Sequence, residues 1–203
     1  MWPTGKSIMR KVILQEWLSI DGFAADRNGN LDFVTSAELN KESDKDLVHF
    51  MDTVDTILLG AVTYKLFVDF WPAATTETEI IADKLNNTEK IVFSGSLTHA
   101  PWGKWPKATI VRADAPQQIN KLKTQPGKNM VVWGSISLAQ SLIRQNIFDE
   151  YHLRICPIAV GNGRSLFPVN MDTLNLTLVE FKKYASGLIL LRYEPNSRRV
   201  DFL

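Results

Sequence analysis

Cysteine is almost absent from this chain of 203 residues, and the one that occurs is Cys156. A single thiol cannot form an internal disulfide, which is typical of proteins from reducing compartments. Cys156 lies within an apolar pattern of strand length, so we interpret it as a packing residue and not as a nucleophile. Residues 1–8 contain Pro3 and Gly5 and resemble neither a signal peptide nor a membrane anchor. We therefore expect a cytoplasmic protein with no membrane partner.

An excess of charge of one sign is also lacking. The chain carries 23 Lys and Arg against 22 Asp and Glu, spread along the sequence, for a net charge of +1. Proteins that bind nucleic acid usually concentrate basic residues on one face. We therefore predict no nucleic-acid partner.

Fingerprints of metals and common cofactors are missing as well. The histidines lack metal-ligand spacing, so we predict no metal site. They are His49, His99 and His152. Paired Cys-x-x-Cys motifs, His-Glu-x-x-His and Walker-type phosphate loops do not occur. The absence of Gly-x-Gly-x-x-Gly argues against a standard Rossmann domain.

Apolar residues make up 45% of the chain, and their periodicity predicts alternating strands and helices. The strand-length runs are Val12–Leu18, Thr56–Leu59, Lys90–Phe93, Ala108–Arg112, Asn129–Trp133, Tyr151–Ile155, Leu174–Phe181 and Gly187–Tyr193. Helical periodicity covers Asp44–Asp52, Val62–Phe70, Ile80–Leu85, Ala115–Lys123 and Ser137–Gln145. This alternation is typical of an α/β protein with a mainly parallel sheet covered on both faces. The turn Ala185–Gly187 predicts a hairpin and an antiparallel C-terminal edge.

Neither an internal repeat nor a linker interrupts the chain, so one domain is expected over residues 9–195. Residues 1–8 would form an N-terminal extension and residues 196–203 a polar tail. Two long segments without periodicity, Ser19–Ser36 and Pro157–Asp172, carry turn-forming residues. Long structured loops that follow strands are often functional.

Two glycines stand where a predicted strand meets a predicted helix. Gly60 follows Thr56–Leu59, with Thr63 in the first helical turn, and a second strand leads into Gly134 and Ser135. Such a junction brings backbone N–H groups and the positive end of a helix dipole to a phosphate. Two junctions indicate a ligand with more than one phosphate, and a dinucleotide is the simplest. Ordinary helix caps explain the same residues.

Four further polar residues are candidates for the site. Ser94 and Ser96 follow a predicted strand and would suit an adenosine ribose or its 2′-phosphate, although a solvated turn explains them equally well. Reduction of a C=N or carbonyl group needs a proton source. Asp21, in the first long loop, and Glu38, at the start of a helix, are the candidate acids. A turn and a helix N-terminus account for the same two acids.

Together these motifs resemble the dihydrofolate reductase-like superfamily. The closest match is to the C-terminal reductase domains of riboflavin biosynthesis and their stand-alone bacterial relatives. The resemblance rests on Ser19–Ala25, Phe33–Glu38, Leu58–Tyr64 with Trp71-Pro72, Lys90–Ser94, Val132–Ser135 and Gly161–Pro168. It extends over roughly Met9 to Tyr193. It implies a three-layer α/β/α fold with a mixed, mainly parallel sheet and an antiparallel C-terminal edge.

The resemblance also implies NADPH as cofactor. The implied contacts are Gly60, Thr63, Gly134 and Ser135 to its phosphates, Ala24 and Ala25 to the nicotinamide, and Ser94 and Ser96 to the adenosine end. Asp21 and Glu38 would orient the substrate or relay a proton. Relatives often dimerise, which implies a homodimer. Tyr151–Ile155 and Leu188–Leu191 either supply its interface or belong to the core.

The function implied is that of an NADPH-dependent reductase resembling 5-amino-6-(5-phosphoribosylamino)uracil reductase. Those enzymes hold the ribose phosphate with arginines, whereas Leu39 and Asn40 follow Glu38 here. Each charge-assisted bond so lost is worth about 1.5–3 kcal/mol. Two alternatives stay open: reduction of dihydrofolate, another pterin or another small molecule, and a non-catalytic nucleotide-binding protein of the same fold.

Overall fold

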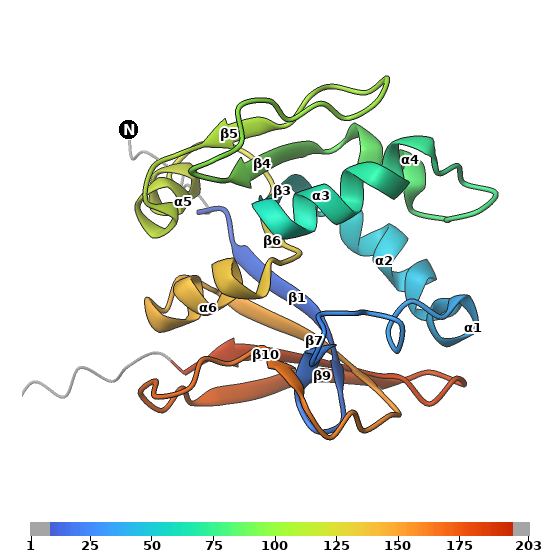
Figure 1. The fold of residues 1–203 in the computed structure, drawn as a ribbon. Helices are drawn as coiled ribbons and strands as arrows, with labels where there is room; N and C mark the ends of the chain where they lie inside the picture. Colours follow the sequence, from blue (N-terminus) through green and yellow to red (C-terminus); the bar gives the residue numbers. More distant parts are fainter. Residues whose placement is uncertain (1–8, 197–203) are drawn as a thin grey trace, which may run out of the picture.

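The structure, a computed structural model, describes residues 9–196 and contains one large sheet with helices on both faces (Figure 1). Its strands lie in the order β5-β4-β3-β6-β1-β7-β10-β9. They are β1 (Val12–Ser19), β3 (Val54–Gly60), β4 (Glu89–Phe93), β5 (Thr109–Val111), β6 (Asn129–Val132), β7 (Glu150–Cys156), β9 (Leu176–Lys183) and β10 (Ile189–Pro195). The helices are α1 (Ala37–Asn40), α2 (Ser43–Met51), α3 (Ala61–Phe70), η1 (Trp71–Ala73), α4 (Ala82–Asn87), α5 (Ala115–Lys123) and α6 (Ile136–Arg144). The expected N-terminal extension, residues 1–8, and residues 197–203 of the expected tail lie outside the described part.

The sheet is parallel from β5 to β7 and antiparallel at its C-terminal edge. β1 pairs in parallel with both β6 and β7, which places it at the centre. β10 runs antiparallel to β7, and β9 antiparallel to β10. The predicted hairpin is present, and Gly187 in its turn has a φ of 87°, which glycine adopts at little cost. The predicted mixed sheet is confirmed.

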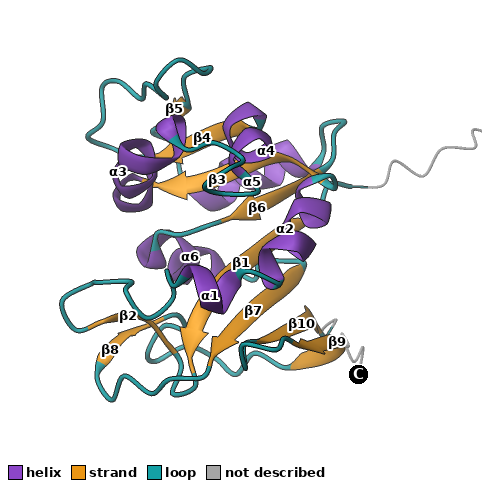
Figure 2. Ribbon diagram, turned by 90° about the vertical axis from the view of Figure 1, so that its right-hand side faces the viewer, coloured by secondary structure: helices purple, strands orange, loops and turns teal. Residues whose placement is uncertain are grey.

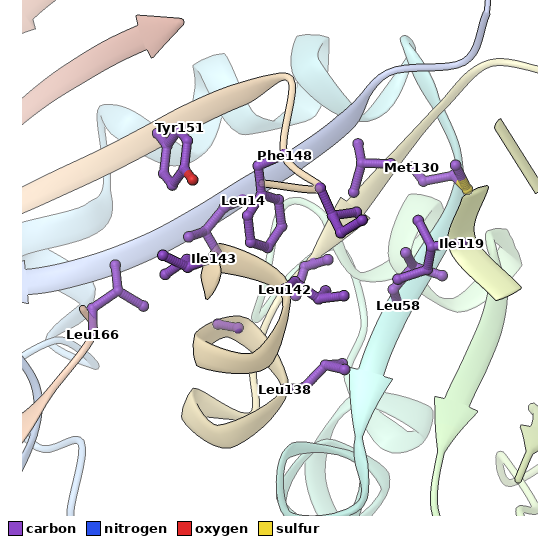
Figure 3. Packing of buried hydrophobic residues seen from close by; sticks show 14 of the residues in the cluster. Leu14, Leu58, Ile119, Met130, Leu138, Leu142, Ile143, Phe148, Tyr151 and Leu166 are labelled. Carbon is purple, nitrogen blue, oxygen red and sulfur yellow. The ribbon is translucent and has the colours of Figure 1, made fainter. Parts of the chain in front are cut away.

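Side chains of the central strands point alternately to the two faces of the sheet and form a hydrophobic core on each face. Met130 and Val132 of β6 pack beneath α5 and α6, whereas Val131 between them packs beneath α2, α3 and α4. α6 places Leu138 and Leu142 one turn apart on its buried side (Figure 3). Burying such a leucine contributes about 1.5–3 kcal/mol. The helices are therefore held to the sheet by apolar burial on both faces.

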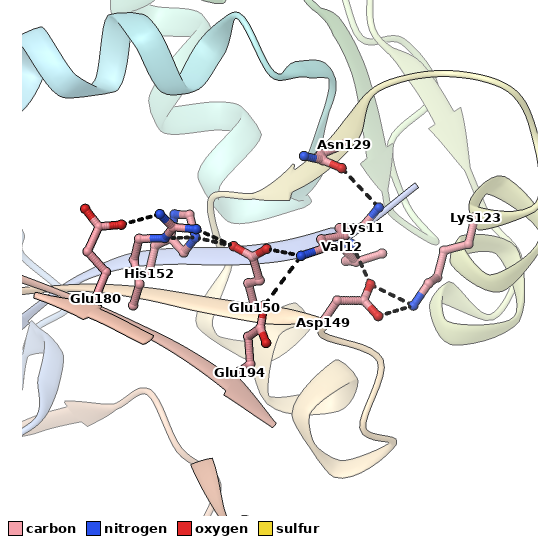
Figure 4. Close-up of polar contacts among 10 residues, drawn as sticks. Lys11, Val12, Lys123, Asn129, Asp149, Glu150, His152, Glu180 and Glu194 are labelled. Carbon is pink, nitrogen blue, oxygen red and sulfur yellow. Dashed lines mark hydrogen bonds and ion pairs between the residues drawn. The ribbon is translucent and has the colours of Figure 1, made fainter. Parts of the chain in front are cut away.

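Charged groups tie together the amino ends of the central strands (Figure 4). Glu150, at the start of β7, is buried and bonds to His152 Nε2 at 2.7 Å and Lys11 Nζ at 2.6 Å. The hydrogen bond from His152, reinforced by Lys11, lowers the pKa of Glu150 to about 2. Asp149 accepts a 2.8 Å hydrogen bond from the backbone N–H of Val12. This network fixes the start of β1 against β7, away from the carboxyl ends of the strands.

Each of the two long loops contains a short strand that the periodicity did not predict. β2 (Phe23–Asp26) and β8 (Gly163–Ser165) pair antiparallel in a separate two-stranded sheet (Figure 2). Gly163 permits the pairing, because a Cβ there would overlap the carbonyl oxygen of Ala25. The strands come from distant parts of the sequence, so no local pattern marks them.

One predicted helix is displaced along the chain, whereas the other four agree with α2, α3, α5 and α6 to within one residue at each end. The predicted helix Ile80–Leu85 is observed as α4 over Ala82–Asn87, since Ile80 is exposed while Ile81 and Leu85 are buried. The helix expected to start at Glu38 is present as the short α1, although the periodicity predicted no bounds for it.

Cys156 lies buried in β7, and burial raises the pKa of its thiol to about 11. The interpretation of this residue as core is confirmed. Within residues 9–196 no helix combines the length and apolar character that a membrane span requires. The same residues contain no cluster of three or more His, Cys, Asp or Glu side chains arranged to hold a metal ion.

Candidate active-site cleft

A cleft opens where β1 and β6 separate. The two strands pair in parallel as far as Leu14 and Val132. Beyond that pair, the next residues of both strands line a cavity of about 510 Å³, a size usual for small-ligand sites. These residues are Gln15, Glu16 and Trp17 of β1, and Trp133, Gly134 and Ser135 after β6. The cavity lies at the carboxyl ends of parallel strands, where open α/β sheets bind ligands.

Apolar and aromatic side chains form most of the cleft wall. Helix α3 contributes Val62, Leu66 and Phe67, and η1 contributes Trp71. Further apolar lining residues are Ile81, which directly precedes α4, Leu85 within α4, and Leu31 and Val34 from the loop after β2. Trp133 packs against Phe67 with the ring centroids 6.3 Å apart. Among the lining residues of the described chain, Glu16 and Arg164 carry the ionisable side chains. The wall therefore suits a flat, largely apolar ligand surface.

The two predicted glycine junctions contact each other beside this cleft. The backbone N–H of Gly60 donates to the carbonyl oxygen of Gly134 over 3.0 Å. A Cβ on Gly60 would overlap Ser135 Oγ, and a Cβ on Gly134 would lie 2.5 Å from Thr63 Oγ1. Gly134 also has a φ of 81°, which favours glycine. Thr63, Gly134 and Ser135 line the cleft directly, and Gly60 supports them.

The helices that follow these glycines begin without side-chain caps. Gly60 is the N-cap residue of α3 and Ser135 that of α6, and neither helix has a side-chain cap hydrogen bond. The Oγ of Ser135 instead lies 3.0 Å from that of Ser137. The hydroxyls of Thr63 and Ser135 therefore do not cap these helices. The first N–H groups of both helices are left for another partner.

The small β2–β8 sheet forms the opposite side of the cleft. Ala24 and Ala25 of β2 line it, and both are buried. Arg164 of β8 also lines it. Its guanidinium packs against Gly29, and a Cβ added to Gly29 would lie 3.0 Å from Arg164 Cζ. The pairing of two long loops therefore brings the predicted nicotinamide contacts to the cleft.

Ser94 and Ser96 do not line the cleft. Ser94 follows β4, and its Oγ accepts hydrogen bonds from the backbone N–H groups of Ser96 at 3.3 Å and Leu97 at 3.0 Å. These bonds form a local turn at the same edge of the sheet as the cleft. Contact of the two serines with an adenosine end stays a prediction.

The predicted acids Asp21 and Glu38 also lie outside the cleft lining. Asp21 accepts backbone hydrogen bonds from Val160 at 3.1 Å and Gly161 at 2.7 Å. Hydrogen bonds from Ser19 and then from Gly161 lower the pKa of Asp21 to about 2. Glu38 is exposed in the first turn of α1. Asp21 therefore anchors the loop before β8, and catalytic roles for both acids stay predictions.

Gln15 is a cleft residue that the sequence did not single out. It is 1% exposed, and its Oε1 accepts a 2.7 Å hydrogen bond from Trp133 Nε1. Its Nε2 has no hydrogen-bond partner within the described residues. The indole N–H can only donate, so Trp133 fixes which end of the amide is the free donor. Gln15, a residue of the cleft wall, thus keeps a buried N–H group without a partner.

Glu16 is the second residue that the sequence did not indicate. It lies between Leu14 and Leu18, whose side chains enter the core beneath α6 together with Ala24. Burial raises the pKa of Glu16 to about 8. The available signal was a Gln-Glu pair that interrupts the apolar run of β1 shortly before Asp21. A half-buried carboxyl in a cleft with a perturbed pKa is a candidate proton donor.

The buried side chain of Arg154 packs against Trp17, a residue of the cleft wall. The Arg154 guanidinium of β7 lies 4.6 Å from the ring centroid of Trp17, which lines the cleft. Arg154 is 1% exposed, and its Nε and Nη1 have no hydrogen-bond partner in the described chain. Burial raises the pKa of nearby Asp44 to about 6, although Arg154 opposes that shift. The guanidinium therefore holds the Trp17 ring in place by a cation–π contact.

The fold is that of dihydrofolate reductase-like proteins. The chain belongs to the RibD C-terminal domain family, whose model matches residues 10–190. YyaP of Bacillus subtilis (strain 168) is 29% identical over 189 residues, which cover 92% of this chain and 96% of YyaP.

Solved structures confirm the predicted fold class. A putative riboflavin biosynthesis protein from Shewanella sp. PV-4 is similar with a TM-score of 0.75 at 21% identity, covering 92% of this chain and 99% of that one. Dihydrofolate reductase from Enterococcus faecalis, complexed with NADP(H), is similar with a TM-score of 0.59 at 10% identity, covering 92% of this chain and 97% of that one.

Proposed function

We propose that this protein is an NADPH-dependent reductase of a small molecule. The observation that carries the proposal is the contact between the Gly60 and Gly134 junctions at the wall of one apolar cleft. Membership of the RibD C-terminal domain family supports an oxidoreductase. The dihydrofolate reductase of the same fold is complexed with NADP(H), which supports the choice of cofactor.

The residues around the two junctions fit such a cofactor. The uncapped first turns of α3 and α6 offer N–H groups and positive dipole ends to a pyrophosphate. The space that a Cβ would fill at either glycine is restricted, which accounts for glycine at both positions. Ala24 and Ala25 leave room for a flat nicotinamide ring. Ser94 and Ser96, at the same edge of the sheet, are the proposed contacts to the adenosine end.

In the proposed reaction the residues of the chain orient the substrate, exclude water from the cleft and donate a proton to the substrate. NADPH, when bound, supplies a hydride to an electrophilic carbon of the substrate. Trp17, Trp71 and Trp133 would cover the substrate and exclude water from the cleft. Asp21 holds the loop that leads to β8 and would keep that side of the cleft closed.

The activity that the sequence resembles is reduction of 5-amino-6-(5-phosphoribosylamino)uracil, and reduction of dihydrofolate or another pterin is the alternative. Arg164 is the cation that lines the cleft, and its side chain is exposed. One exposed guanidinium is a weaker phosphate site than the arginine pair of the riboflavin enzymes. A non-catalytic nucleotide-binding protein remains the third candidate.

Calorimetric titration of the purified protein with NADPH and with NADH tests the proposal. Heat of binding with NADPH is the expected result, and absence of heat with both coenzymes would overturn the proposal. Oxidation of NADPH followed at its absorbance band, with a panel of acceptors, then separates a reductase from a protein that only binds the nucleotide.

We also propose a homodimer that uses the exposed edge strand β9. Phe181 is 70% exposed, and Leu178 and Val179 beside it are about half exposed. Tyr151 and Leu190, by contrast, are buried, so their strands belong to the core and do not offer an interface. An exposed apolar edge strand favours pairing with another chain, and a second copy is the simplest partner.

A further inference from the structure

We infer that the substrate is a planar, uncharged compound whose C=O or C=N group is held by Gln15 and protonated by Glu16. The inference rests on the proposed function, because it requires a hydride donor in the same cleft. It adds the class of the substrate and the source of the proton.

The free amide hydrogens of Gln15 select a hydrogen-bond acceptor. Trp133 occupies the Oε1 of Gln15, and the Nε2 has no partner in the described chain. A buried donor without a partner costs about as much as a lost hydrogen bond, so a ligand that accepts from it gains affinity. A carbonyl oxygen or an imine nitrogen has the required lone pair, whereas a protonated amine has none.

Glu16 is the source of the proton in this inference; its side chain leaves β1 on the opposite face from that of Gln15, and both residues line the cleft where β6 has diverged. The Glu16 carboxyl group accepts a hydrogen bond from the backbone N–H of Trp17 but has no ion pair or side-chain hydrogen bond in the described chain, and Glu16 lines a cleft with apolar walls. In this setting the carboxylate is disfavoured, so the group stays protonated at neutral pH. A neutral carboxyl is both a hydrogen-bond donor and a general acid.

The charged neighbours of Glu16 are few. β7 contributes Arg154, which contacts the ring of Trp17 behind the cleft wall, and β8 contributes the exposed Arg164. The lining residues of β2, β6, α3 and α6 carry no ionisable side chain in the part of the chain described. Burial, and not a like charge, is therefore the cause of the perturbed titration of Glu16.

The scarcity of cationic side chains at the cleft also bears on the charge of the substrate. A phosphate or carboxylate of the substrate would need a buried cation or several N–H donors on the aromatic wall. That wall is formed by Trp17, Phe67, Trp71 and Trp133; the Arg154 guanidinium lies against the ring of Trp17, and the side chain of Arg164, on the β8 side of the cleft, is exposed. Flat uncharged rings stack favourably on such side chains. The wall therefore favours uncharged, planar compounds over phosphorylated sugars.

The proposed step transfers one hydride and one proton to the substrate. The C4–H bond of NADPH breaks, and its electron pair forms a new C–H bond at the electrophilic carbon. The π electrons of the C=O or C=N group move to the heteroatom, which takes the proton from the Glu16 carboxyl. The products are NADP⁺ and an alcohol or amine, and Glu16 regains its proton from water.

Two uncharged probes and one anionic probe test the substrate class. The uncharged probes are 9,10-phenanthrenequinone, with C=O groups, and 7,8-dihydrobiopterin, with a C=N group; the anionic probe is 5-amino-6-(5-phosphoribosylamino)uracil. We expect kcat/KM to be at least about tenfold higher for one uncharged probe than for the anionic one. A higher value for the anionic probe overturns the inference.

Two nearly isosteric variants test the residues. Gln15→Glu keeps the acceptor for Trp133 but replaces the free donor with an oxygen, so the KM for the preferred probe should rise about tenfold with little change in NADPH affinity. Glu16→Gln keeps a donor but cannot release a proton, so kcat should fall about 100-fold or more. Glu89→Gln, an exposed carboxylate at the start of β4, is the control and should match the wild type.

Two readouts separate a proton donor from a structural residue. The kcat of the wild type should fall above about pH 8, and Glu16→Gln should lack that limb. Without any cofactor, the ¹³C NMR signal of the Glu16 carboxyl, assigned by its loss in Glu16→Gln, should titrate near pH 8. Titration near the ordinary glutamate value, or an unchanged pH profile in the variant, overturns the role. Failure of NADPH to bind in calorimetry would instead overturn the proposed function.

Discussion

The backbone N–H of Gly60 donates to the carbonyl oxygen of Gly134, and this 3.0 Å hydrogen bond joins the ends of β3 and β6. Each glycine faces a hydroxyl side chain of the other junction, Ser135 and Thr63 respectively. The two helix N-termini are therefore one composite site. Alteration of either glycine should affect both helices at once.

Gly134→Ala should weaken both folding and NADPH binding. The new Cβ would lie 2.5 Å from Thr63 Oγ1 at a φ of 81°, so we expect a loss of about 1–3 kcal/mol in the free energy of unfolding. Gly187→Ala is the matched control, because Gly187 also has a positive φ, of 87°, but its Cβ would meet Pro157 at an ordinary 3.4 Å and it does not line the cleft. Denaturant unfolding and NADPH titration provide the measurements. Equal effects of the two variants would contradict the composite site.

Asp21→Asn should loosen the loop that leads to β8. The Asp21 carboxylate accepts from Val160 and Gly161, and its pKa is lowered to about 2 from a reference value of 3.8. Its stabilisation is therefore complete above about pH 4 and is lost as the pH falls toward 2. We expect faster proteolysis within 157–172 at pH 7 in the variant. Cleavage rates equal to those of the wild type would contradict the anchoring role.

Glu150→Gln should destabilise the protein through the polar network at the amino end of β7. Loss of the charged hydrogen bonds to His152 and Lys11 should cost about 1.5–3 kcal/mol at pH 7. The folded pKa of Glu150 is about 2 against a reference of 4.5, so the difference from the wild type should shrink as the pH falls from 4.5 toward 2. Urea unfolding at several pH values measures this. NADPH affinity should stay constant, since the network lies away from the cleft.

Cys156 should be unreactive in the folded protein. It is fully buried, and burial raises its pKa to about 11, so the thiolate is scarce at pH 8. Ellman's reagent should therefore label the native protein very slowly and label one thiol per chain in guanidinium chloride. Rapid labelling of the native protein would show that β7 opens readily.

Phe181→Glu should shift the proposed dimer toward monomer. The substitution replaces the most exposed apolar side chain of β9 with a charged one. Val169→Glu is the control, because Val169 is also highly exposed, at 75%, but lies in a loop outside β9. Light scattering coupled to size-exclusion chromatography reports the mass. A monomeric wild-type protein, or dissociation by both variants, would contradict an interface on β9.

The periodicity of the sequence was sufficient to predict the layers of this protein. Strands buried on both faces are continuous apolar runs, and a helix such as α6 repeats its apolar residues once per turn, so both signals are local. The hairpin at Gly187 and the strand–glycine–helix junctions at Gly60 and Gly134 were visible for the same reason. Fold class and the two phosphate-binding candidates therefore depend on short stretches of sequence.

Tertiary structure alone decided which of those stretches meet. The pairing of β2 with β8 joins two loops that are distant in the sequence, and it carries Ala24 to the cleft while Asp21 becomes an anchor. The divergence of β1 from β6 converts Gln15 and Glu16 from interruptions of an apolar strand into groups of the cleft wall. Strand register and burial create these environments, and the pKa of a carboxyl depends on its surroundings and not on its position in the chain.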